Sequence, residues 1–193
     1  MNTRKSTKSM AISSLIVVFL VLLDQITKWL AYKNLYQTSG RSIIPGVFEL
    51  RYLENESAAF SFDPISLLHR IFHFSYFYEH PEAFLMAKMI FFIVLTIVVL
   101  ILIAIIYQRI PVSKHFLPLN IIAIGIFAGA IGNLIDRIIH HYVIDFFYFR
   151  LINFPIFNVA DIYVTVAAIA LIVVILFYYK EDDFSCIFSK KES

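Results

Sequence analysis

The chain of 193 residues has few of the features of a water-soluble protein. Only 16% of its residues are charged, whereas 60% are hydrophobic and the mean hydropathy is +0.80. Soluble domains are about 25% charged and about 45–50% apolar. The formal net charge of +2 is also too small to indicate a polyanionic partner. This composition excludes a disordered chain and a nucleic-acid-binding module, and it predicts that lipid surrounds most of the protein.

Cysteine and several protease signatures are also scarce or absent. Cys186 is the only cysteine, which excludes an intrachain disulfide and a thiolate metal cluster. The sequence contains no H-E-x-x-H zinc motif, no G-x-S-x-G elbow and no glycine–aspartate motif of the presenilin type. These absences argue against three other classes of hydrolase.

Long apolar runs dominate what is present. A membrane-crossing helix needs about 20 mostly apolar residues. Four segments meet this requirement, at about 10–31, 83–107, 117–139 and 158–179. The first segment follows a short basic stretch and could be a cleaved signal peptide, but no small-x-small cleavage site comes after it. The sequence therefore favours a retained helix and predicts an all-α integral membrane protein with one membrane domain, 1–193.

The distribution of basic residues predicts the orientation of these helices. The N-terminal segment, the loop after the second helix and the C-terminal segment carry eight lysines and arginines in short spans, against six in two longer loops. Because basic residues concentrate on the cytoplasmic side, we expect both termini there, as short tails at 1–9 and 180–193. The two longer loops then lie outside the cell membrane.

The first of these loops has features of its own. Its residues from about 41 to 80 begin with partly alternating apolar and polar residues, rich in β-branched and aromatic side chains. This pattern is typical of short strands. Aromatic residues interleaved with histidine and arginine follow, as in an amphipathic helix at the membrane interface. We therefore expect a small extracytoplasmic β-rich segment and an interfacial helix.

Ionisable residues inside the apolar segments are the strongest functional signal, because each is costly in lipid. The ionisable residues are Asp24 and Lys28 in the first helix, Asp136 and Arg137 in the third, and Asp161 in the fourth. Two polar asparagines lie near them, Asn133 in the third helix and Asn158 in the fourth. With the predicted topology, the three aspartates fall at a similar depth in the outer leaflet. The coincidence indicates one site.

Helical spacing predicts how this site is built. Gly125, Gly129 and Gly132 share a face of the third helix with Asp136, and small residues on such a face let another helix approach closely. If the polar face of the fourth helix meets it, Asp136 and Asp161 oppose each other and share a proton. One carboxyl group would then act as an acid and the other as a base, as aspartic proteases require.

The same residues also have simpler structural interpretations. These are an Asp24–Lys28 ion pair, helix–helix hydrogen bonds from Asn133 and Asn158, an Asp136–Arg137 ion pair, and an Asp161 that only interacts with a helix dipole. A channel subunit or membrane scaffold is an alternative function. However, a proton path needs polar groups across the whole membrane, and the inner half of each predicted helix is apolar.

Five short motifs follow one another along the chain: Asp24–Lys28, Asn55–Phe60, Gly132–Arg137, Val143–Phe146 and Phe157–Asp161. With these motifs in this order, the chain resembles signal peptidase II, the bacterial lipoprotein signal peptidase family. The resemblance covers the whole transmembrane region.

The resemblance implies roles for nine residues. Asp136 and Asp161 would be catalytic; Asn55, Asn133, Arg137 and Asn158 would hold the site and the substrate backbone; Asp24 and Lys28 would support the fold. Asp145 would either be structural or support the catalytic residues from the layer behind them. The implied substrate is a diacylglyceryl-modified prolipoprotein, cleaved just before its lipidated cysteine near the outer surface of the bacterial plasma (inner) membrane. Neither a metal nor an organic cofactor is implied, and globomycin-type cyclic peptides are the implied inhibitors.

Two departures from the family pattern affect loops. Ser57 stands where the family usually has glycine, and serine would be strained by about 1–2 kcal/mol if the backbone there needs a positive φ. The segment 146–157 also looks longer than usual, and could form an altered lid or a surface excursion.

Overall fold

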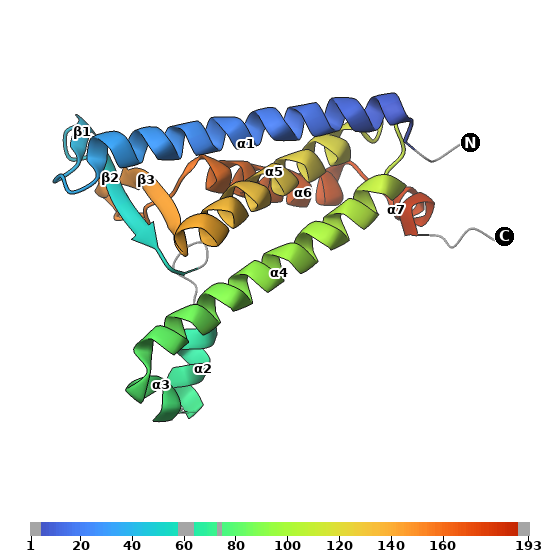
Figure 1. Cartoon of the computed structure of the whole chain (residues 1–193). Coiled ribbons are helices and arrows are strands. Elements are labelled where there is room, and N and C mark those ends of the chain that lie inside the picture. The colour runs from blue at the N-terminus through green and yellow to red at the C-terminus, as the bar shows by residue number, and fades with distance from the viewer. Residues whose placement is uncertain (1–4, 58–63, 73–74, 189–193) are drawn as a thin grey trace.

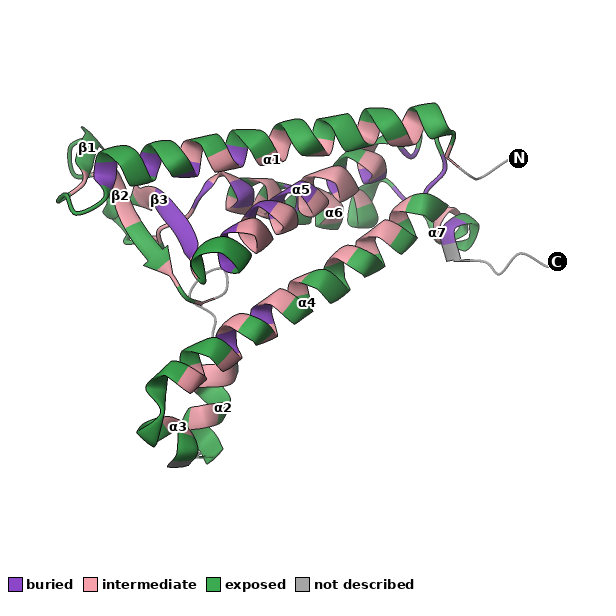
Figure 2. Cartoon of the chain, in the orientation of Figure 1, coloured by how far each residue is buried: buried purple, intermediate pink, exposed green. Residues whose placement is uncertain are grey.

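The computed structural model describes residues 5–57, 64–72 and 75–188. Four of its helices are long and apolar enough to cross a membrane, which confirms the predicted fold class: α1 (Thr7–Leu35), α4 (Pro81–Arg109), α5 (Leu117–His140) and α6 (Val159–Phe177). Many of their residues are exposed (Figure 2), and a large number of these exposed residues are large hydrophobic ones. Proteins in water rarely expose so many apolar side chains, so this surface is suited to contact with lipid.

The central helix of the bundle is α5, which packs on α6, α1 and α4 (Figure 1). The glycines of α5 allow α6 to approach it closely. A Cβ added at Gly129 would lie 2.5 Å from the backbone oxygen of Ala160, and Ala160 itself is fully buried. The face of α5 that the sequence marks by small residues is therefore the face on which α6 packs.

A three-stranded antiparallel sheet covers one end of the bundle. Its order is β1 (Arg41–Ile44), β2 (Phe48–Asn55) and β3 (Val143–Phe149). The second strand pairs with the third from Phe48 opposite Phe149 to Asn55 opposite Val143. Strands were expected in the first long loop only, so β3 is an addition from the second. Buried apolar side chains attach the sheet to α1: Ala31, Leu35, Ile144 and Phe146.

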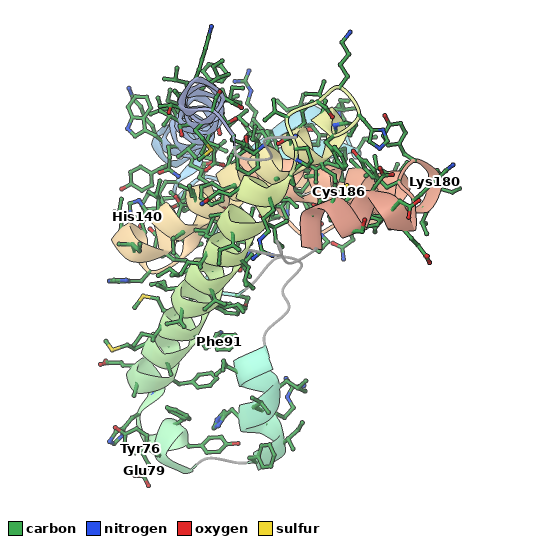
Figure 3. All side chains as sticks on the ribbon, turned by 90° about the vertical axis from the view of Figure 1, so that its right-hand side faces the viewer. Tyr76, Glu79, Phe91, His140, Lys180 and Cys186 are labelled. Atoms are coloured by element: carbon green, nitrogen blue, oxygen red, sulfur yellow. The ribbon has the colours of Figure 1, made fainter. Side chains whose placement is uncertain are left out.

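Two short helices, α2 (Pro64–Phe72) and α3 (Ser75–Glu79), lie beside the first turns of α4. They stand apart from the rest of the bundle, with Tyr76 and Glu79 at the far tip (Figure 3). The ring of His69 contacts those of Phe77, Tyr78 and Phe84. This segment contains the helix that the interleaved aromatics predict.

Both described ends of the chain lie at the end of the bundle opposite the sheet (Figure 1). There the segment expected to be a tail forms a further helix, α7 (Glu181–Phe188). Its Ile187 is buried with Ile110, Phe116 and Tyr179, so α7 packs on this end of the bundle. At the N-terminus, α1 begins earlier than expected because Ser6 caps it by accepting a hydrogen bond from the Ser9 backbone.

Candidate active site

A buried ion cluster lies where α1, α5 and α6 meet beneath the sheet. The ammonium group of Lys28 lies 2.9 Å from Asp24 and 2.9 Å from Asp136, and it donates a 2.9 Å hydrogen bond to Asn133. The side chains of Lys28 and of both aspartates are 2% exposed or less. The expected Asp24–Lys28 ion pair is therefore present, but it is part of a larger cluster.

Asp136 is enclosed by this cluster. Besides Lys28, it accepts hydrogen bonds from the side chain of Gln25 at 2.9 Å and from the backbone N–H of Ile144 at 3.1 Å. These three contacts come from α1 and β3. The sequence analysis includes Gln25 only as a member of the first motif and does not predict its hydrogen bond to Asp136. Its position next to Asp24 is the only feature of the sequence that points to this contact.

Asp24 joins α1 to the start of α6. One carboxylate oxygen accepts a 2.9 Å hydrogen bond from the backbone N–H of Ala160, in the first turn of that helix. A carboxylate is favoured there by the partial positive charge of a helix N-terminus. The contact needs Gly132, because a Cβ added at this position would lie 2.5 Å from the Asp24 carboxylate.

Two asparagine side chains connect a second pair of carboxyl groups. Asn133 donates a 2.8 Å hydrogen bond to Asp161, and Asn158 donates one of 2.6 Å to Asp145. The two amides are themselves joined, because Asn158 also donates to the carbonyl oxygen of Asn133 at 3.2 Å. Asp145 and Asp161 therefore belong to one hydrogen-bond network built from β3, α5 and α6.

The first turn of α6 fixes Asp161 through a capping box with Asn158. The backbone N–H of Asp161 donates to the Asn158 side chain at 2.9 Å, and the backbone N–H of Asn158 donates to the Asp161 carboxylate at 3.1 Å. Asp161 thus has the helix-terminal role weighed in the sequence analysis. It also remains partly exposed, unlike the other three carboxyl groups of this region.

Asp145 is only 1% exposed and accepts a 2.7 Å hydrogen bond from Asn55 in β2. Burial, followed by the nearby Asp161 carboxylate, raises the pKa of Asp145 to about 7, although the hydrogen bonds from Asn55 and Asn158 oppose that rise. A carboxyl group in this environment exchanges its proton near neutral pH.

Asp145, Asp161 and Asn55 line one pocket of about 180 Å³. Its walls are apolar and come from the loop after β3 and from the next turns of α6: Phe154, Pro155, Ile156, Phe157, Ile162, Thr165 and Val166. Asp136 is not among the lining residues. The segment 146–157, which looked longer than usual, thus forms the end of β3 and one wall of this pocket.

Arg137 supports the loop that follows β2. It donates to the backbone oxygen of Ser57 at 3.1 Å and to that of Asn133 at 3.3 Å, and it lies over the Phe92 ring at 5.4 Å. Within the described ranges no ion pair joins it to Asp136.

The loop itself lacks the strain expected at Ser57. The backbone N–H of Ser57 donates a 2.9 Å hydrogen bond to the side-chain oxygen of Asn55, and Ser57 is not among the non-glycine residues with positive φ. The condition for strain at Ser57, a positive φ, is therefore not met. The remaining motif residues, Ala58 to Phe60, lie outside the described residues.

All nine residues expected at the site gather at the sheet end of the bundle, but in an arrangement that the spacing did not predict. The polar faces of α5 and α6 meet, yet no hydrogen bond in the described parts of the chain joins Asp136 to Asp161. The described residues also contain no group of three histidine, cysteine, aspartate or glutamate side chains placed to hold a metal ion.

Comparison with known proteins identifies the family. The family model described as signal peptidase (SPase) II matches residues 16–67 and 62–177. The chain belongs to the signal peptidase II family. Lipoprotein signal peptidases from Caldanaerobacter subterraneus and Streptococcus pneumoniae are 40% and 36% identical to it. These alignments cover 81% and 88% of this chain and 90% and 95% of the relatives.

Solved structures of bacterial membrane enzymes also match the chain. Two structures described as bacterial membrane enzymes superpose on this chain with a TM-score of 0.66 at 27% and 29% sequence identity. They cover 100% and 93% of the chain, and the chain covers 99% and 100% of them. The chain is thus a multi-pass membrane protein of a bacterial peptidase family.

Proposed function

We propose that the protein is an aspartic endopeptidase that removes the signal peptide from diacylglyceryl-modified prolipoproteins, just before the lipidated cysteine. The family assignment supports the substrate class. The observation that carries the proposed chemistry is the pair of carboxyl groups, Asp145 and Asp161, that line one pocket at the end of the membrane helices.

We assign the acid–base pair to Asp145 and Asp161. The spacing of the motifs predicts instead that Asp161 pairs with Asp136. The geometry favours Asp145, because Asp136 is enclosed by Lys28, Gln25 and the Ile144 backbone and does not line the pocket. A catalytic carboxyl group has to reach the scissile bond or its water.

Charge balance favours one protonated carboxyl group in this pair. Among the described residues of this region, four aspartates, at positions 24, 136, 145 and 161, interact with two basic side chains, Lys28 and Arg137. Lys28 is already matched to the enclosed aspartates. With its pKa raised to about 7, Asp145 is the group that holds a proton, and Asp161 accepts two N–H hydrogen bonds, which suits a charged carboxylate.

Hydrolysis then follows from these two states. Asp161 takes a proton from a water molecule, whose oxygen attacks the scissile carbonyl carbon, while Asp145 gives its proton to the carbonyl oxygen. The tetrahedral diol collapses when Asp161 passes its proton to the leaving amine nitrogen and Asp145 recovers a proton from the diol. Water has been added across the C–N bond, and both carboxyl groups return to their starting states.

The supporting residues hold the carboxyl groups of Asp145 and Asp161 in position relative to each other. Asn133 and Asn158 fix the distance between the two carboxyl groups, and Asn55 orients Asp145 from the sheet. Asp24 and Lys28 hold α1 against α5 and α6 beneath them. We place both termini in the cytoplasm and the sheet on the outer surface, so that the pocket opens near the outer leaflet, and we expect globomycin-type cyclic peptides to occupy it.

The experiment that tests this function is a gel-shift cleavage assay in detergent. The substrate is a diacylglyceryl-modified prolipoprotein, with an unlipidated copy beside it. We expect the wild-type protein to cleave only the lipidated copy, and the Asp145→Asn and Asp161→Asn variants to cleave neither. A folded wild-type protein that cleaves neither copy would contradict the proposal, and so would cleavage that survives in both variants.

A further inference from the structure

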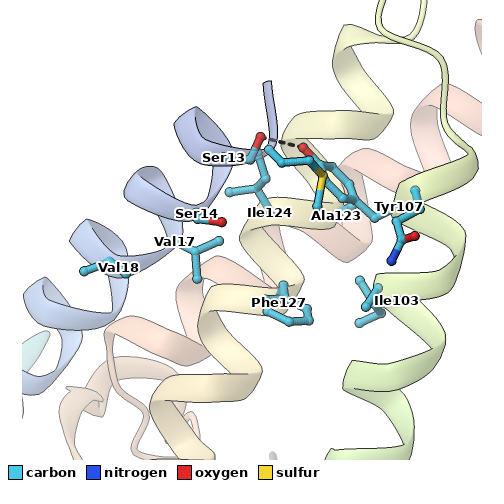
Figure 4. Close-up of a pocket in the computed structure, with 12 residues that line it drawn as sticks. Ser13, Ser14, Val17, Val18, Ile103, Tyr107, Ala123, Ile124 and Phe127 are labelled. Atoms are coloured by element: carbon cyan, nitrogen blue, oxygen red, sulfur yellow. Dashed lines mark hydrogen bonds between the residues drawn. The ribbon is translucent and has the colours of Figure 1, made fainter. Parts of the chain in front are cut away.

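A second set of cavities lies at the opposite end of the bundle from the aspartates. There α1 and α4 both pack on α5. A hollow of about 270 Å³ is lined by residues of all three helices, and Figure 4 shows it in close-up. Its walls are mostly apolar, with Val17, Ile103, Ala123, Ile124 and Phe127 from the three helices. The hollow belongs to none of the chemistry proposed above.

A polar contact marks the mouth of this hollow. The hydroxyl groups of Ser13 on α1 and Tyr107 on α4 lie 2.5 Å apart, as Figure 4 shows. Both residues also line an adjoining hollow of about 430 Å³, which reaches the loop between α4 and α5. This second hollow has polar and basic lining residues as well: Lys5, Ser9, Ser113, Lys114 and Asn120.

Lys5 is a partly enclosed cation that has no acidic partner among the described residues. Its ammonium group lies 3.8 Å from the centre of the Tyr107 ring and donates a hydrogen bond to Asn120. Burial lowers the pKa of Lys5 to about 8. Within the described parts of the chain no carboxylate lies at ion-pair distance from it, and no described residue lining either hollow is acidic. The site therefore lacks one negative charge.

We propose that the two hollows together bind one anionic phospholipid of the surrounding membrane. An acyl chain would lie in the apolar hollow between α1 and α4, and the headgroup phosphate would lie between Lys5 and Lys114. The hydroxyl groups of Ser9 and Ser113, which line the same hollow as these lysines, can donate hydrogen bonds to phosphate oxygens.

The shape and charge of the hollows favour this occupant over others. A helix of a partner protein has a diameter of about 10–12 Å with its side chains and does not fit a cavity of this volume. A free phosphate ion would leave the apolar hollow empty. Basic residues close to the ends of membrane helices attract anionic lipids on the cytoplasmic side, where we place this end of the bundle.

Direct binding measurements test the headgroup part of the proposal. Native mass spectrometry of the full chain in detergent would compare phosphatidylglycerol with phosphatidylcholine and inorganic phosphate. We expect a bound phosphatidylglycerol, with weaker binding of phosphatidylcholine and none of phosphate. Lys5→Gln should weaken phosphatidylglycerol binding about fivefold, whereas Lys8→Gln, an exposed neighbour outside the hollows, should change it less than twofold.

The acyl-chain part needs a variant that fills the apolar hollow. Ala104 lines it and Ala11 does not, so Ala104→Phe and Ala11→Phe form a matched pair. We expect Ala104→Phe to remove binding of both lipids while Ala11→Phe retains it, with both variants melting within a few degrees of the wild type. Equal binding of the two lipids, or equal effects within either pair of variants, would overturn the proposal. If the melting temperature drops only in Ala104→Phe, its loss of binding could come from poorer folding. The smaller substitution Ala104→Leu then decides, because the proposal requires that it also weakens binding.

Discussion

The ammonium group of Lys28 lies 2.9 Å from the carboxylate of Asp136, and neither side chain is exposed to solvent. This ion pair joins α1 to α5. Asp136 also accepts hydrogen bonds from Gln25 on α1 and from the Ile144 backbone on β3. This arrangement suits a structural role, in which Asp136 joins α5 to α1 and β3.

Asp136→Asn should therefore reduce stability more than catalysis. Breaking a buried ion pair costs about 3–5 kcal/mol, and the loss here should be near the lower end because Asp24 still neutralises Lys28. We expect a melting temperature at least about 5 °C lower, with cleavage retained by the protein that stays folded. Asp145→Asn is the matched comparison and should show the reverse pattern. An Asp136→Asn variant with normal melting and no cleavage would support the pairing expected from the sequence.

The activity should fall as the pH rises above neutrality. Because the pKa of Asp145 is raised to about 7, this group is protonated below that pH and can donate to the scissile carbonyl. Above pH 7 the proton is lost, and kcat/KM should fall about tenfold for each further pH unit. The profile would be measured from pH 5 to 9 on the lipidated substrate, with circular dichroism at each pH to show that the protein remains folded. A flat profile to pH 9 would rule out Asp145 as the acid.

The same pKa predicts a change in stability with pH. A buried carboxyl group with a raised pKa binds a proton in the folded protein at pH values where the unfolded chain has already lost it. The stability should therefore decrease as the pH rises from about 4 to about 7, and this contribution should be constant above that range. Melting temperatures of the wild type and Asp145→Asn would be compared across this window. If both variants show the same slope, the titrating group is not Asp145.

Helix periodicity and topology were enough to predict that Asp24, Asp136 and Asp161 lie at one end of the bundle. The partner of each carboxyl group was not predictable. Asp136 turns toward Lys28, which belongs to a helix about 100 residues earlier, and no spacing within α5 encodes that choice. Asp145 lies on β3, whose pairing with β2 decides which side chains are buried. The sequence of β3 does not reveal a partner strand from another loop.

The close packing of α5 on α6 predicts different effects for two glycines. A Cβ at Gly129 would lie 2.5 Å from the Ala160 backbone oxygen and 2.7 Å from Val164, so Gly129→Ala must separate the helices. Overpacking of this kind costs about 1–3 kcal/mol. A Cβ at Gly125 would lie 3.4 Å from Ala167, so Gly125→Ala should cost less than 1 kcal/mol. Melting temperatures in one detergent would check this, and equal losses in both variants would contradict the described packing.

The proposed orientation can be tested with the single cysteine of the chain. Cys186 is exposed on α7, at the end that we place in the cytoplasm. A membrane-impermeant maleimide added to intact spheroplasts should therefore leave it unlabelled until the membrane is permeabilised. Ser39→Cys in a Cys186→Ser background places an exposed thiol beside the sheet, and it should react without permeabilisation. If Cys186 is labelled in intact spheroplasts and the Ser39→Cys thiol is not, the orientation is the opposite of the one we propose. The pocket of Asp145 and Asp161 would then face the cytoplasm, where a precursor cleaved at the outer surface could not reach it.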